Sequence, residues 1–261
     1  RCETAILNAD DGPVVLGANR FAGRKIFFSL DTPAPGEIGV VEELLIDRAF
    51  VADPQEASMI CELIDIVPTV PHNVSNALAA AGLALSLDVP HEAIQKALQS
   101  FRPGRHRIET VHEADGITWV DDSKATNPHA AAASLMSHLS VVWIAGGLAK
   151  GADMEALVER CASRIKAAIL IGADRDLIEA ALIKHAPDVP RILVNAPSEY
   201  SRGGESNSLM ELIVQAASEH ANSGDAVLLA PACASMDQFI SYADRGDRFA
   251  AAVRKVIAHE V

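Results

Sequence analysis

The residues from Trp119 to Pro128 gather the polar side chains best suited to chemistry in this chain. The stretch begins as an apolar run and ends in Asn127-Pro128, where Asn is a good helix N-cap and Pro fits the first helical position. Capping needs one polar side chain, so it leaves the run from Asp121 to Lys124, and Thr126, without an explanation. Unpaired N–H groups at a helix start attract anions. The stretch therefore predicts a strand end, a ligand-binding turn and a helix start.

Two further segments combine glycine or small residues with groups that could bind a ligand. Gly146 to Asp153 reads Gly-Gly-Leu-Ala-Lys-Gly-Ala-Asp, which is not a nucleotide phosphate loop because that loop needs Gly-Lys-Ser/Thr at the start of a helix. Lys150 is instead a candidate for holding a carboxylate, since a buried anion needs charged donors. Alternatively, Lys150 and Lys124 are simply exposed lysines in turns.

The third segment, Leu229 to Phe239, contains Cys233 and Ser235 but has the pattern of neither a thiol nor a serine nucleophile. No histidine follows Cys233 nearby, so we expect a small buried side chain rather than a reactive thiol. Ser235 lacks the Gly-x-Ser-x-Gly elbow of serine hydrolases. Arg245 falls at a predicted helix start, where a cation is unfavourable, and this favours a ligand or ion-pair role for it.

These three segments, in this order, resemble the motifs of the Mur ligase family, and most closely of its D-glutamate-adding members. The resemblance rests on Asp-Asp-Ser-Lys-Ala-Thr-Asn at 121–127, on 146–153, and on 229–239 followed by Tyr-Ala-Asp-Arg-Gly at 242–246. It covers residues from about 101 to 261 well and the first 100 more loosely, through 7–11 and 71–80. The Asp-Asn-Pro-Arg motif of the members that add meso-diaminopimelate is absent.

The resemblance implies part of an ATP-dependent amide ligase of peptidoglycan precursor synthesis, located in the cytoplasm. Such an enzyme adds D-glutamate to UDP-N-acetylmuramoyl-L-alanine through an acyl phosphate, with ATP and Mg²⁺. Its UDP-binding domain, its phosphate loop and its metal ligands have no counterpart in these 261 residues. We therefore expect an N-terminally truncated chain without a metal site, inactive by itself. A folylpolyglutamate synthetase-type ligase and a noncatalytic Rossmann-like binding module are the alternatives.

The resemblance also implies a set of site residues. Arg107 and Lys150 would be the catalytic charges; ATP would contact Asn73, Asn76, Arg107 and Asp122; and D-glutamate would contact Lys124, Thr126, Lys150, Ser235 and Tyr242. His106 and Arg245 are added as further residues of the cleft. The alternatives are a surface position for His106, capping or first-turn surface for Asn73 and Asn76, and core packing for Tyr242.

The composition excludes several classes of protein. Lys and Arg number 22 against 35 Asp and Glu, a formal charge of −13, which argues against nucleic acid or an anionic membrane as a partner. Cys2, Cys61, Cys161 and Cys233 are far apart and show no zinc or disulfide pattern, as in reduced intracellular proteins. No apolar run approaches the ~20 residues of a membrane span. The sequence does not indicate an oligomeric state.

The predicted elements divide the chain near residue 102. Short strands are expected at 5–7, 14–16, 25–30 and 38–41, and helices at 73–87 and 90–101. The basic, Pro-Gly-containing stretch from Ser100 to Arg107 marks a domain boundary, and Arg suits phosphate contacts. The expected fold is α/β: an incomplete central-domain half at 1–101 and a complete C-terminal Rossmann-like domain at 102–261.

The second part alternates strands and helices, which predicts a mostly parallel sheet covered on both faces. A hairpin around Asp115-Gly116 joins strands at 108–111 and 117–120. Further strands are expected at 141–145, 168–171, 191–194 and 226–229, with helices near 153–164, 174–185, 207–220 and 244–259. Since each motif follows a strand end, the three should share one cleft at the carboxyl edge of the sheet.

Overall fold

The computed structural model describes residues 3–53, 55–195 and 206–257, and its fold is α/β. The chain forms two compact units, Arg1–Pro103 and Gly104–Val261. Within the described residues, no helix combines the length and the apolar character that crossing a membrane requires.

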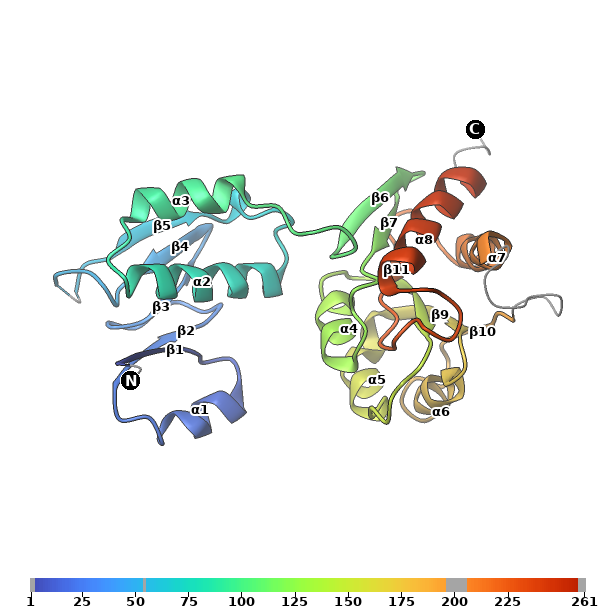
Figure 1. The fold of residues 1–261 in the computed structure, drawn as a ribbon, viewed down its shortest axis with the longest axis horizontal. Coiled ribbons are helices and arrows are strands. Elements are labelled where there is room, and N and C mark those ends of the chain that lie inside the picture. The colour runs from blue at the N-terminus through green and yellow to red at the C-terminus, as the bar shows by residue number, and fades with distance from the viewer. Residues whose placement is uncertain (1–2, 54, 196–205, 258–261) are drawn as a thin grey trace. The chain divides into compact units, whose positions relative to one another are not determined.

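The first unit is a five-stranded sheet with strand order β1-β2-β3-β4-β5. Strands β1 (Thr4–Asn8), β2 (Arg24–Phe28) and β3 (Ile38–Val41) are parallel, and β4 (Leu44–Asp47) and β5 (Ser58–Glu62) continue it in antiparallel pairing. A 3₁₀ turn, η1 (Leu63–Asp65), precedes the helices α2 (Pro71–Leu85) and α3 (His91–Ser100). Both helices lie over one side of this sheet (Figure 1) and share its apolar core.

The predicted strand at 14–16 is wrong, because these residues lie in helix α1 (Gly12–Ala18). Asp11 caps this helix by accepting a hydrogen bond from the Val14 N–H, and Pro13 stands in its first turn. The sequence Asp-Asp-Gly-Pro therefore starts a helix, although its composition also suits a turn. Strands β4 and β5 were not predicted.

The second unit is a six-stranded sheet with strand order β10-β9-β8-β11-β7-β6, and only β6 is antiparallel. The hairpin consists of β6 (Glu109–Ala114) and β7 (Ile117–Asp121), as predicted. The parallel strands that follow are β8 (Val141–Gly146), β9 (Ile165–Ile171), β10 (Arg191–Leu193) and β11 (Ala226–Leu229). Strands β8 and β11 are buried throughout, which explains their unbroken apolar sequences.

Helices cover both faces of this sheet (Figure 1). Helices α7 (Ser206–Ser218) and α8 (Tyr242–Val256) pack on one face, around a core that includes Trp119 and Phe249. The other three helices are α4 (Pro128–Leu135), α5 (Glu155–Cys161, extended by the 3₁₀ turn η2 at Ala162–Arg164) and α6 (Arg175–His185). The end of the predicted last helix, 258–259, lies outside the described residues.

The strand order brings the three motifs to one edge. From β7 the chain crosses to β8, continues outward to β9 and β10, and returns to place β11 between β8 and β7. Consequently the carboxyl ends of β7, β8 and β11, at Asp121, Gly146 and Leu229, are neighbours. A point where the strand order reverses is where α/β sheets bind ligands.

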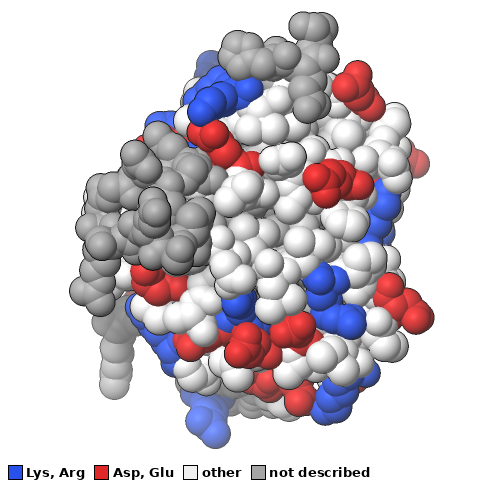
Figure 2. All heavy atoms as spheres, turned by 90° about the vertical axis from the view of Figure 1, so that its right-hand side faces the viewer, with Lys and Arg blue, Asp and Glu red and all other residues white. Residues whose placement is uncertain are grey.

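The face of the protein drawn in Figure 2 carries both acidic and basic side chains. On the visible part of that face, acidic and basic side chains are interspersed among uncharged residues, most of them in the lower half of the view, and the basic ones form no continuous patch.

Candidate functional site

Backbone hydrogen bonds join the three motif segments. The Asp122 N–H donates to the Leu229 carbonyl at 2.9 Å, and the Ala232 N–H donates to the Ala125 carbonyl at 3.0 Å. The Gly146 N–H donates to the Pro231 carbonyl at 2.9 Å. Segments that are about 80 to 110 residues apart in sequence thus form one loop cluster beyond the strand ends.

The glycine turn after β8 is held on two sides. Leu148 and Ala234 exchange two backbone hydrogen bonds of 2.9 Å each. On the other side, the Asp174 carboxylate accepts from the Ala149 N–H at 2.8 Å, and the Asp174 N–H donates to the Gly147 carbonyl at 3.0 Å. Asp174 was not a predicted site residue, although its place after a strand and before a helix could have indicated it.

Glycine is required in this turn by both conformation and space. Gly147 has φ +129°, and a Cβ there would lie 2.2 Å from the Ala234 carbonyl oxygen. Gly146 has φ +123°, and its Cβ would lie 1.9 Å from the Ile171 carbonyl oxygen. Only residues without a side chain allow the turn to approach its neighbours this closely.

Lys150 lies at the exposed tip of this turn. Its φ of +53° is the left-handed conformation that costs a side-chain-bearing residue about 1–2 kcal/mol. Among the described residues, its ammonium group has neither an ion pair nor a hydrogen bond. An unpaired cation on a rigid, strained turn is well placed to meet an anionic ligand.

Lys124 has a different environment. Its ammonium lies 3.8 Å from the centroid of the Tyr242 ring, which orients it by a cation–π contact. Its backbone N–H donates to the His106 carbonyl at 3.1 Å. The turn after β7 and the start of α8 thus present Lys124 and Tyr242 side by side.

Asp122 and Arg107 form the second charged part of the cluster. Asp122 is buried, and burial raises the pKa of its carboxyl from 3.8 to about 6, an effect that the nearby Asp121 charge strengthens. The Arg107 guanidinium is exposed, and its positive charge lowers the pKa of the Asp122 carboxyl, against the effect of burial. A buried acceptor and an accessible cation therefore lie close enough for their charges to interact, although they form no ion pair with each other.

Among the three arginines of the boundary stretch, Arg107 is the one left available. Arg105 pairs with Asp247 at 2.8 Å, and Arg102 donates to the carbonyls of Gln99 and Phe101. Within the ranges that the structure covers, no such partner engages the Arg107 side chain.

His106 is not a surface histidine, because only 5% of it is exposed. Its Nδ1 is hydrogen-bonded to the buried Asp121 carboxylate at 2.7 Å, and Gly246 packs against both: a Cβ on Gly246 would lie 2.3 Å from Nδ1. His106 and Asp121 are the residues just before Arg107 and Asp122. This hydrogen bond therefore connects the two segments that carry the charged pair.

The cluster of His106, Glu109 and Asp121 has the side chains of a metal site, with ligand atoms within 4.8 Å of one another. These atoms already have protein partners. Glu109 accepts from the His106 N–H at 2.9 Å, and Asp121 accepts from the Ser123 N–H at 2.9 Å. The arrangement is satisfied without an ion.

Contrary to the expectation from the sequence, the Arg245 side chain does not line the cleft. Its exposed fraction is 0%, and its guanidinium donates to Ser123 and to the Cys233 carbonyl. The prediction of a ligand or ion-pair role considered only its position at the start of α8, and that position did not show which way the side chain turns.

Ser235, Thr126 and Cys233 lie within the joined segments. Ser235 is 3% exposed, and its carbonyl accepts from the Phe239 N–H at 2.8 Å; Thr126 is half-buried beside Lys124. The expectation for Cys233 is confirmed: the residue is fully buried, and burial raises the pKa of its thiol to about 12. A thiol in this state is not a nucleophile at neutral pH.

Asn73 and Asn76 lie on helix α2 of the first unit and neither is its N-cap, which is Val70. The Asn73 amide donates to the Pro68 carbonyl at 3.1 Å, and Asn76 is exposed. Residues three apart share a helix face, so the two amides lie on the same side of α2.

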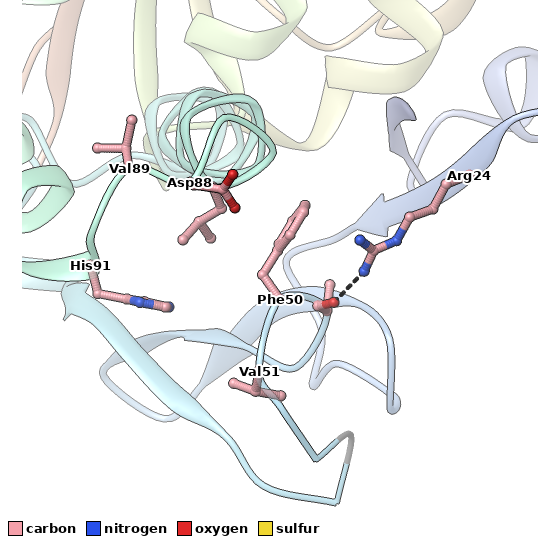
Figure 3. A pocket seen from close by; sticks show the side chains of 8 residues that line it. Arg24, Phe50, Val51, Asp88, Val89 and His91 are labelled. Carbon is pink, nitrogen blue, oxygen red and sulfur yellow. Dashed lines mark hydrogen bonds between the residues drawn. The ribbon is translucent and has the colours of Figure 1, made fainter. Parts of the chain in front are cut away.

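A pocket of the first unit, shown in Figure 3, contains none of the predicted site residues. The Arg24 guanidinium, which lines this pocket, donates to the Ala49 carbonyl at 2.6 Å and lies over the Phe50 ring. Its His91 pairs with the buried Asp47 at 2.9 Å. Because these polar groups are engaged with the protein, the loop cluster of the second unit remains the candidate site.

Comparison with known proteins adds to this geometry. The family model described as Mur ligase, glutamate ligase domain, matches residues 106–233, which contain all of the first two motifs and part of the third. The UDP-N-acetylmuramoylalanine–D-glutamate ligases of Streptomyces avermitilis and Thermobifida fusca are 51% and 53% identical to the chain over 232 and 228 residues. The chain belongs to the Mur ligase family.

These alignments cover 88% and 87% of the chain but only 48% and 47% of the relatives. The chain thus spans about half the length of the Mur ligases that it matches. Solved structures agree on the fold. A pseudomurein peptide ligase type C from Methanothermus fervidus has a TM-score of 0.63 at 16% identity. The match covers 98% of this chain and 56% of the ligase. MurF from Acinetobacter baumannii has a TM-score of 0.58 at 18% identity, covering 98% of the chain and 51% of its own length.

Proposed function

We propose that this chain forms the part of an ATP-dependent amide ligase that binds D-glutamate and contributes to nucleotide binding. The ligase would add D-glutamate to UDP-N-acetylmuramoyl-L-alanine in peptidoglycan precursor synthesis. The observation that carries the proposal is the loop cluster at the ends of β7, β8 and β11, whose hydrogen-bonded segments carry Lys124 and Lys150. Two cations suit an amino acid with two carboxylates.

In this proposal the two units have different tasks. Gly104–Val261 is the C-terminal, Rossmann-like domain that binds the amino acid, and Arg1–Pro103 is the second half of the central ATP-binding domain. The enzyme would act in the cytoplasm, with ATP, the UDP-linked acceptor and D-glutamate as its small-molecule partners.

The residues that would hold D-glutamate lie on all three segments. Lys150 would hold one carboxylate, and Lys124, oriented by Tyr242, would hold the other or a phosphate oxygen. Thr126 and Ser235 would donate their hydroxyl hydrogens. These contacts would fix the amino group for attack on the activated acceptor, and orientation of this kind lowers the barrier of a bimolecular step.

ATP fits the charged pair of the second unit. A nucleotide needs an acceptor for its ribose hydroxyls and a cation for its phosphates, and Asp122 and Arg107 provide one of each. When bound with Mg²⁺, ATP supplies the phosphoryl group that activates the acceptor carboxylate, and Arg107 and Lys150 would stabilise the charge that develops.

The experiment is an assay of the full-length product of the gene that encodes this chain. We expect Mg²⁺-dependent joining of labelled D-glutamate to UDP-N-acetylmuramoyl-L-alanine, with one phosphate released per product. L-glutamate and meso-diaminopimelate serve as competing amino acids. Preference for either of them, or phosphate release that does not depend on D-glutamate, would contradict the proposal.

Asp122→Asn should raise thermal stability near neutral pH and weaken nucleotide binding. The pKa of the folded carboxyl is about 6 against an ordinary 3.8, so the folded protein favours the protonated form. The ionised carboxylate therefore lowers stability above pH 6, and this cost disappears as the pH falls from 6 towards 4. A neutral amide avoids the cost but loses the charged acceptor for the ribose.

The measurement is a set of melting curves between about pH 4 and 8, with ATP titrations by calorimetry. The stability advantage of the variant should shrink as the pH falls, and only the unmodified protein should lose extra affinity below about pH 6. Protonation of the ATP phosphates affects both proteins equally, so it cancels when their affinities are compared. Asp188→Asn, at an exposed carboxylate, is the control. An advantage that does not change with pH would contradict this assignment of Asp122.

A further inference from the structure

Arg245 is a fully buried cation whose hydrogen bonds all go to two of the motif segments. Its Nε donates to the Ser123 hydroxyl at 2.9 Å, and one Nη donates to the Ser123 carbonyl at 3.0 Å. Both Nη atoms also donate to the Cys233 carbonyl at 3.3 Å. One guanidinium therefore bridges the turn after β7 and the loop after β11.

This position is costly for a cation. Burial lowers the pKa of the Arg245 guanidinium to about 10, and the side chain belongs to the first turn of α8, where the helix dipole disfavours positive charge. Apolar side chains of similar volume often replace buried charges without loss of stability. Stability alone therefore does not account for an arginine here, whereas control over the geometry of two loops does.

The two bridged loops carry the residues assigned to the amino acid. Ser123 precedes Lys124, Cys233 stands two residues before Ser235, and the Ser123 hydroxyl donates to the Tyr242 carbonyl at 2.7 Å. The Arg245 side chain thus contacts one wall of the site through Ser123 and the other through Cys233. The backbone of α8, the helix that carries Arg245, also contacts the first wall, through the Tyr242 carbonyl.

We propose that Arg245 is a positioning residue that sets the distance between the two walls of the amino-acid site, and hence the length of amino acid that the site accepts. This inference rests on the proposed function. The planar guanidinium fixes the directions of its donors, so the spacing of its two acceptors is fixed as well. A lysine keeps the charge but can donate only from a single flexible point.

The test compares Arg245→Lys with Arg254→Lys, an exposed arginine on the same helix, in the full-length gene product. We expect Arg245→Lys to raise the KM for D-glutamate about tenfold and to change the KM for ATP less than about twofold, since its lost charged hydrogen bonds lie at the amino-acid walls. Discrimination between D-glutamate and the shorter D-aspartate should fall. Arg254→Lys should change none of these quantities.

Ser123→Ala provides a second, milder variant in case Arg245→Lys does not fold. It removes the hydroxyl that accepts from Nε and donates to the Tyr242 carbonyl, and it leaves both carbonyl acceptors of Arg245 in place. We expect a rise in the KM for D-glutamate of about threefold, again with little change for ATP.

The outcomes separate the inference from the function on which it rests. If the unmodified protein does not join D-glutamate, the proposed function fails. If it does, but folded Arg245→Lys and Ser123→Ala keep their KM for D-glutamate and their discrimination against D-aspartate, Arg245 is only structural and the inference fails. Equal increases in the KM for D-glutamate and for ATP would also overturn it.

Discussion

Replacing Lys150 with alanine should raise the KM for D-glutamate by roughly 10- to 100-fold and leave the KM for ATP nearly unchanged. The lost interaction is a charge-assisted contact to a carboxylate, worth about 1.5–3 kcal/mol. The ammonium is exposed at the tip of a turn held by Ala234 and Asp174, so its removal should not disturb the loops beneath it.

The measurement is steady-state kinetics of the full-length gene product with each substrate varied in turn. Lys184→Ala is the matched control, because Lys184 is also an exposed lysine of the second unit and its ammonium pairs with Glu155. Lys150→Arg should recover part of the affinity, since it restores the charge with a different shape. A parallel rise in the KM for ATP would show that Lys150 does not distinguish the two substrates.

Gly147→Ala should strongly destabilise the protein, because it adds a methyl group where the backbone of another loop leaves no room for one. A Cβ at this position would lie 2.2 Å from the Ala234 carbonyl oxygen, and the backbone has φ +129°. Neither atom of this contact is the end of a flexible side chain, so the turn after β8 must move away from the loop after β11. We expect a loss of about 3 kcal/mol, or roughly 6–12 °C in melting temperature.

Gly151→Ala separates the two causes of this loss. Gly151 also has a positive φ, +77°, but a Cβ there would meet nothing within 4 Å. Its substitution should cost only the backbone strain, about 1–2 kcal/mol. Urea and thermal unfolding of the 261-residue chain measure both variants. Equal losses would mean that the contact with Ala234 contributes nothing beyond conformation.

The local patterns of the sequence predicted most of the second unit. Alternation of apolar runs and helical periodicity is a property of adjacent residues, so the strands of the parallel sheet and its covering helices could be located in advance. The hairpin at Asp115-Gly116 and the cap at Asn127-Pro128 were equally accessible, because turn and cap chemistry involve residues only a few positions apart. Placement of all three motifs at strand ends followed from the same patterns.

Short apolar runs in the first unit were harder to interpret. Val14, Val15 and Leu16 have the composition of a strand, yet the Asp11 cap and Pro13 start a helix there. The strands β4 and β5 are short and flanked by charged residues. The pairing of β4 with β3, and of β5 with β4, supplies the hydrogen bonds that their sequence does not indicate.

The element order of the second unit, the three motifs and the family resemblance could be predicted from the sequence, because each depends on residues close together along the chain. The burial of Arg245 between Ser123 and Cys233, and the hydrogen bond between His106 and Asp121, became visible only in the folded chain. Arg245 and Ser123 are 122 residues apart in sequence. A hydrogen bond between residues so far apart in sequence can form only once β11 lies between β8 and β7. Local sequence patterns do not predict the direction in which a side chain points after such a rearrangement.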